Sequence, residues 1–184
     1  MRKILLYILL LTTGTVLALE DISLNVVIPE KVSVGENFTI DVYVNLKRNI
    51  SGFECSIDTP VYGSEYIRFI NVTENLEIKE RAGDFYMLNL EDNSVFISFA
   101  LLDKPLDSDF HLFTVKGEAL KEGNLTVRVT AVASDEEGNA IRLPPLTYKL
   151  EIVDDNQDKK EKEENIFSWI IEIILNLLRR IFGG

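Results

Sequence analysis

The most constraining feature of this sequence is a two-residue alternation of apolar and polar side chains between residues 22 and 153. The alternation comes in short segments, among them residues 38–44, 95–99 and 125–131, and Gly and Asn interrupt it roughly every 8 to 12 residues. A period of two places successive side chains on opposite faces of a strand. Strand and helix patterns do not alternate, so we predict an all-β fold in which two antiparallel sheets form a β-sandwich.

The composition narrows the functions that such a sandwich can have. The chain has 19 Lys and Arg against 30 Asp and Glu, and its net charge of -11 argues against a nucleic-acid partner, which needs clustered cations. A single Cys cannot form an intrachain disulfide or a paired-cysteine metal site. Alternation places that residue, Cys55, on the apolar face of residues 53–58, where we expect a buried and inert thiol. We therefore predict no metal site and no cofactor.

The sequence offers little material for catalysis. Its one His, His111, lies in a strand pattern close to Asp109, and the adjacent acids Glu91 and Asp92 lie in a turn pattern. Side chains in such places are ordinarily solvated or hydrogen-bonded. We therefore predict that the chain is not an enzyme and that it has no catalytic residues.

The first 18 residues have the organisation of a secretory signal peptide. Arg2 and Lys3 precede an apolar stretch at residues 4–11, and small residues lead to a cleavage position after Ala18. The stretch is shorter than the roughly 20 residues of a spanning helix; an uncleaved membrane anchor is the alternative. Four Asn-x-Ser/Thr triplets agree with export and predict glycosylation at Asn37, Asn49, Asn71 and Asn124.

The C-terminal region changes character twice. Residues 154–165 are all charged or amide-bearing, which predicts a solvated linker. In residues 166–182 a polar side chain recurs every four residues, which predicts an apolar helix with a narrow polar stripe. Trp169, Arg179 and Arg180 suit a lipid headgroup boundary, so we predict a helix that lies on the membrane surface as an anchor. A tilted spanning helix, and a helix that packs on another chain or on its own domain, are the alternatives.

Several blocks of the middle region resemble, in order, the strands of a cohesin module. They are residues 31–46, 50–58, 95–100, 112–117, 123–127 and 133–141. The resemblance implies a jelly-roll sandwich of about nine strands within residues 20–153. It also implies an extracellular, noncovalent binding function, in which one exposed sheet face captures a dockerin-like protein domain. Dockerins are small and calcium-dependent, so calcium is expected on the partner only.

Strand parity selects the residues of this expected face. If the apolar residues of segments 53–58 and 95–100 point inward, their neighbours point outward, and Phe96 becomes the aromatic anchor that binding faces often use. Segment 85–90 resembles the strand beside that face, and Tyr86 would extend the patch. The predicted partner-binding residues are Ser56, Asp58, Tyr86, Phe96, Ser98, Arg128 and Thr130.

Two other functions fit the sequence. A carbohydrate-binding module of similar fold would bind a polysaccharide through a planar strip of exposed aromatics, for which Tyr62, Tyr66 and Tyr86 are the candidates. A structural envelope or adhesin subunit would assemble through residues 165–184. The hypothesis that we carry forward is a secreted, membrane-tethered binding module at the extracellular cell surface. Glycosylation triplets in an exported chain with one Cys fit an archaeal surface protein.

Overall fold

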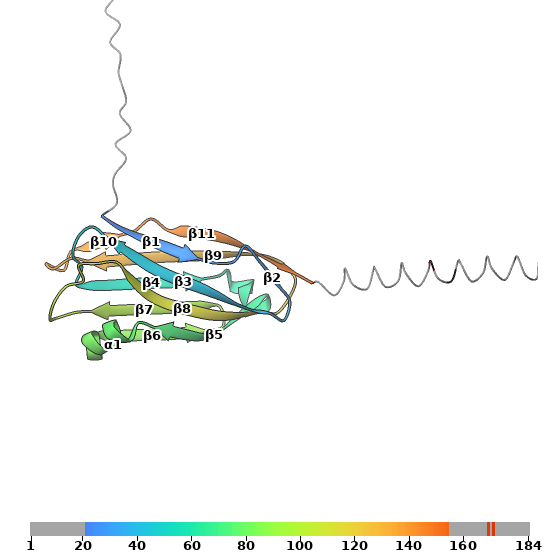
Figure 1. Cartoon of the computed structure of the whole chain (residues 1–184), viewed down its shortest axis with the longest axis horizontal. Coiled ribbons are helices and arrows are strands. Elements are labelled where there is room, and N and C mark those ends of the chain that lie inside the picture. Colours follow the sequence, from blue (N-terminus) through green and yellow to red (C-terminus); the bar gives the residue numbers. More distant parts are fainter. Residues whose placement is uncertain (1–20, 155–168, 170, 172–184) are drawn as a thin grey trace, which may run out of the picture.

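The structure is a computed structural model, and it describes residues 21–154 together with Trp169 and Ile171. The predicted signal peptide (1–18), the linker (154–165) beyond Asp154, and the helix at 166–182 apart from those two residues lie outside the described part. Arg179 and Arg180 lie outside it as well. The strands run lengthwise along the sandwich, and the chain enters at one end and leaves at the other (Figure 1).

One of the two sheets, here called sheet A, has four antiparallel strands. Each has one face turned to the core, and all three pairings join strands that are not consecutive in the chain. Its order is β1 (Ile22–Val27), β3 (Asn37–Leu46), β8 (Phe110–Ala119) and β5 (Ile67–Glu74).

The second sheet, sheet B, carries the strands of the expected binding face at its centre. Its order is β2 (Lys31–Ser33), β11 (Leu146–Val153), β9 (Gly123–Ser134), β4 (Gly52–Asp58), β7 (Ser94–Ala100) and β6 (Tyr86–Glu91), and the short β10 (Ala140–Arg142) also pairs with β9. Only the pairing of β2 with β11 is parallel among the described strand pairs. Gly35 and Gly138 occupy turns with φ of 84° and 83°, where a side chain would be strained.

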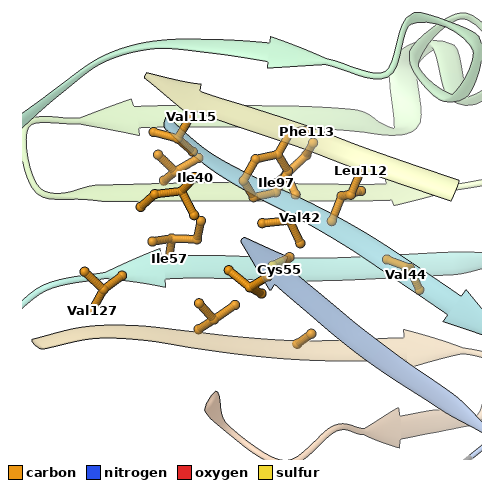
Figure 2. Close-up of a cluster of buried hydrophobic side chains, with 14 of the residues drawn as sticks. Ile40, Val42, Val44, Cys55, Ile57, Ile97, Leu112, Phe113, Val115 and Val127 are labelled. Atoms are coloured by element: carbon orange, nitrogen blue, oxygen red, sulfur yellow. The ribbon is translucent and has the colours of Figure 1, made fainter. Parts of the chain in front are cut away.

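The core fills the space between the sheets with the inward residues of the alternating segments. Phe53, Cys55 and Ile57 of β4 are each at most 1% exposed, and the inward residues of β7 are buried as well, which confirms the predicted parity of both strands. Figure 2 shows Cys55, Ile57 and Ile97 facing the side chains of β3 and β8, such as Val42 and Phe113. The all-β, two-sheet sandwich predicted from the sequence is confirmed.

The structure adds elements that the sequence pattern did not predict. The described residues form eleven strands rather than about nine, because β2 and β10 are only three residues long. A helix, α1 (Leu76–Ala82), and two 3-10 turns, η1 (Val61–Glu65) and η2 (Gly83–Phe85), interrupt the strands. Asn75 caps α1 by accepting a hydrogen bond from Ile78 N, and Ile78 packs into the core. This helix closes the sandwich beside the start of β6.

Candidate partner-binding face

The outer face of sheet B brings six of the seven predicted binding residues together. Directly opposite residues on antiparallel strands share a face. Ser56 on β4 lies opposite Thr130 on β9 and Phe96 on β7, and the rows on either side contain the remaining three predicted residues. In those rows Asp58 is flanked by Arg128 and Ser94, and Glu54 is flanked by Val132 and Ser98. The register therefore turns residues that are distant in sequence into neighbours; their role in binding stays a prediction.

Phe96 is the apolar centre of this face. Its cross-strand neighbours are the small hydroxyl side chain of Ser56 and the exposed amide of Asn89 on β6. The ring is half-buried, because such neighbours cover its lower part and leave the rest open to solvent. An aromatic ring offers a large apolar area with only two side-chain torsions to fix, which keeps the entropy cost of binding low.

Three charges near the centre of this face are not neutralised within the described part of the protein. The side chains of Asp58, Arg128 and Glu54 form no ion pair or hydrogen bond with any described residue. On the outer face of sheet A, by contrast, Arg68 lies 2.8 Å from Glu118 in an ion pair. Unpaired charges of both signs around an apolar centre suit a protein partner whose surface carries the complementary charge opposite each of them.

The placement predicted for Tyr86 is wrong. Tyr86 lies directly opposite Phe99, which is buried, so its ring faces the inner side of sheet B rather than the outer face with Phe96. The ammonium of Lys79 on α1 is 5.8 Å from the centre of this ring. Burial raises the pKa of the Tyr86 hydroxyl above its ordinary value, and the neighbouring Glu74 carboxylate raises it further.

Met87 takes the place on the outer face that we had expected for Tyr86. It lies opposite Ser98 and is 54% exposed. Beside it the face is hollowed where small residues meet Phe85, and this hollow is lined by Glu54, Phe85, Ser98, Ala100, Val132 and Ala140. The alternation of segment 85–90 allowed either parity, so the sequence could have indicated Met87 only if the register with β7 had been known.

The tyrosines proposed for sugar binding do not form a planar strip. The rings of Tyr62 and Tyr66 are 6.3 Å apart but nearly perpendicular, at 78°. Both belong to the η1 region beside Gly123, whereas Tyr86 lies at the start of β6, opposite the last residues of β7. The aromatic platform that stacks on a sugar ring is therefore absent from this set of residues.

Cys55 and His111, the reactive residue types considered above, are each packed against other parts of the fold. Burial raises the pKa of the Cys55 thiol to about 12. His111 Nε2 lies 3.0 Å from the Thr114 hydroxyl, and its ring packs 4.9 Å from that of Tyr43. Among the described residues, no group of three or more His, Cys, Asp or Glu side chains is arranged to hold a metal ion.

Trp169 is the one predicted anchor residue within the described part. It is helical and 63% exposed. None of the helices described here has both the length and the apolar character needed to cross a bilayer. The predicted attachment to a membrane surface stays a prediction.

Comparison with known proteins gives matches at the level of structure. No family model and no curated protein matches the sequence. A cohesin module from the family 33 glycoside hydrolase of Clostridium perfringens superposes with a TM-score of 0.56 at 15% identity, covering 73% of this chain and 98% of that module. The sixth cohesin of scaffoldin B from Acetivibrio cellulolyticus, solved in complex with a dockerin mutant, gives 0.54 at 12% identity, covering 71% and 99%.

An archaeal structure is also similar. The non-cellulosomal cohesin from Archaeoglobus fulgidus has a TM-score of 0.51 at 12% identity, covering 75% of this chain and 96% of that module. In each case the sandwich of this chain spans nearly the whole of the known module. The protein therefore has the cohesin fold, as the order of its sequence blocks predicted.

Proposed function

We propose that this protein is a noncovalent binding module that captures a dockerin-like protein domain on the outer face of sheet B. The observation that carries the proposal is the arrangement around Phe96, a half-buried ring set among small side chains and bordered by the unpaired charges of Asp58, Arg128 and Glu54. Modules with the same fold have been solved in complex with dockerins, which supports a protein partner. Calcium would belong to that partner.

The apolar and the charged side chains of this face would contribute to binding in different ways. Phe96 and Met87 would bury apolar area, which supplies most of the free energy of association. Asp58 and Arg128 would select the partner and its orientation, because a wrong partner would leave a buried charge unpaired. No covalent step is needed, and we propose no catalytic role for any residue.

The proposal includes a location. A signal peptide at residues 1–18 would export the chain, and the helix at 166–182 would hold it on the outer side of the membrane surface. The charged linker at 154–165 would separate the sandwich from the surface, so that a captured domain is displayed at the cell exterior.

A capture experiment tests the proposal. The full chain is immobilised and exposed to envelope and culture proteins of the source organism, once with calcium and once with a chelator, and retained proteins are identified by mass spectrometry. We expect retention of a protein with duplicated acidic calcium loops, with calcium only. Phe96→Glu should abolish it, whereas Val27→Glu, at a 53% exposed position of sheet A, should not.

Other outcomes would point to other functions. Equal retention by the Phe96→Glu and Val27→Glu variants would contradict the assignment of the face. Retention of polysaccharide would favour the sugar-binding alternative. Self-association that disappears when residues 165–184 are deleted would favour a structural subunit.

A further inference from the structure

The four Asn-x-Ser/Thr triplets differ in what the fold does with their side chains. Asn37, Asn71 and Asn124 are exposed, and so is the Thr two residues after each of them, because positions i and i+2 of a strand share a face. Their amide groups form no hydrogen bond with any other described residue. Each can therefore carry a large substituent that extends into solvent without disturbing the folded sandwich.

Asn49 is different. Its side-chain nitrogen, the atom that a glycan would be attached to, donates a hydrogen bond to Glu136 at 2.8 Å. Ser51, which completes this triplet, is only partly exposed, and its backbone nitrogen bonds to Ser134 O. A glycan at Asn49 would replace one of the two N–H groups of this nitrogen and would stand beside the loop that carries Glu136.

Asn37 and Asn71 are neighbours on the outer face of sheet A. Asn37 on β3 lies opposite Glu118 of β8, and Asn71 on β5 lies opposite Lys116 of β8. Their strands flank β8, and their partners on β8 are two residues apart, so the two positions are about 12 Å apart, from a strand spacing of about 4.8 Å and a rise of about 3.4 Å per residue. Substituents on both would stand over β8, above Lys116 and Glu118.

Asn124 lies on the other sheet but at its margin. It lies opposite Glu151 of β11, near the start of β9, and six residues before Thr130. At about 3.4 Å per residue, it is about 20 Å along the strand from the row that contains Phe96. The middle of the partner-binding face is thus free of glycosylation triplets among the described residues.

We propose that Asn37 and Asn71 are N-glycosylation sites that make the outer face of sheet A a carbohydrate-covered surface, opposite the face that binds the protein partner. The inference rests on the exported location in the proposed function. The two faces then have separate roles: glycans shield one sheet from contacts, and the other sheet alone remains open to a protein of the size of a domain.

Site occupancy tests this assignment. The full chain is directed to the secretory pathway of an N-glycosylating eukaryotic host, and glycopeptides are mapped by mass spectrometry before and after enzymatic release of N-glycans. We expect occupancy at Asn37 and Asn71. Thr39→Val and Thr73→Val should each remove one glycan, whereas the matched changes Thr39→Ser and Thr73→Ser, which keep the triplet, should remove none.

A second measurement tests directly whether glycans cover the outer face of sheet A. Acylation of Lys116 by an amine-reactive ester should be several-fold slower in the secreted protein than after release of the glycans, while Lys47, in a loop, should react equally in both. Absence of glycans from Asn37 and Asn71, or equal acylation of Lys116 in both forms, would overturn the proposal. Neither readout uses the dockerin-like partner, so this assignment and the proposed function can fail separately.

Discussion

Asp58 and Arg128 lie directly opposite each other on the neighbouring strands β4 and β9, and neither side chain is paired with any described residue. Two opposite charges in this relation would ordinarily be drawn together. Because the two side chains do not pair, the carboxylate on β4 and the guanidinium on β9 are both available to a partner on the outer face of sheet B.

This relation gives a prediction for Arg128→Glu. The change places a second carboxylate opposite Asp58 and reverses the charge offered to the partner, so we expect affinity to fall at least about tenfold, or about 1.4 kcal/mol. Stability should change by no more than about 1 kcal/mol, the range for like charges opposite each other. Titration calorimetry with the captured domain measures the first quantity and thermal unfolding the second. Lys116→Glu on sheet A is the matched control; an equal loss of affinity there would contradict a specific role for Arg128.

The contact of Gly117 with Phe38 gives a prediction about the core. These residues lie opposite each other on β8 and β3, and a Cβ at position 117 would come within 2.4 Å of the Phe38 ring. We expect Gly117→Ala to lower the free energy of unfolding by about 1–3 kcal/mol, the usual range for overpacking. Urea unfolding measures the loss. In the Phe38→Leu background the same substitution should cost less, and equal costs in the two backgrounds would show that the ring is not the obstacle.

The buried thiol of Cys55 should not react in the folded protein. With its pKa raised to about 12, only about one thiol in ten thousand is ionised at pH 8, and the residue is 1% exposed. A disulfide reagent that reports thiolate should therefore show one equivalent of thiol in denaturant and almost none in native buffer. Rapid reaction of the native protein, without loss of structure, would contradict the placement of Cys55 in the core.

Asp135 gives a prediction about pH. Hydrogen bonds from the backbone and side chain of Asn139, followed by the backbone of Glu137 and the charge of Arg48, hold the pKa of its carboxyl below the usual value. A depressed pKa in the folded state stabilises the fold above the unfolded-state pKa of about 3.9, and this contribution is lost as pH falls through the lower, folded value.

Thermal unfolding of Asp135→Asn and the wild type across pH 2–7 checks this. We expect the variant to be less stable near neutral pH and the difference to shrink below about pH 4, the ordinary carboxyl range. Glu137→Gln, an exposed acid in the same turn, is the control and should track the wild type. A gap that stays constant down to pH 2 would contradict a stabilising role for the charge.

The orientation of the central strands β4 and β7 could be predicted from the sequence because the side chains on one face of each strand are all buried in the core. In residues 53–58 and 95–99 a shift of one residue would expose an aromatic and bury a polar group, so only one parity is physically acceptable. That argument alone places Ser56, Asp58, Phe96 and Ser98 on the outer face, and the same reasoning holds for Arg128 and Thr130 on β9.

Tyr86 could not be placed in this way. Segment 85–90 contains apolar side chains at successive positions, so both parities look acceptable until the register with β7 is known. That register depends on contacts between distant parts of the chain, among them the packing of α1 against β7 and the approach of Lys79 to the Tyr86 ring. The seven residues of α1 are also too few to show a helical period. Asn75, whose amide also donates to His111 O at 2.7 Å, fixes the start of this helix through a contact with β8.

The described chain enters beside Leu46, which lies opposite Ile22, and leaves beside Val34, whose amide bonds to Val153 O. These points are at opposite ends of the long axis of the sandwich (Figure 1). Both limits of the described chain therefore lie away from the row of sheet B that contains Phe96. A partner seated on that row would meet the strands alone, with the two chain ends beyond its margins.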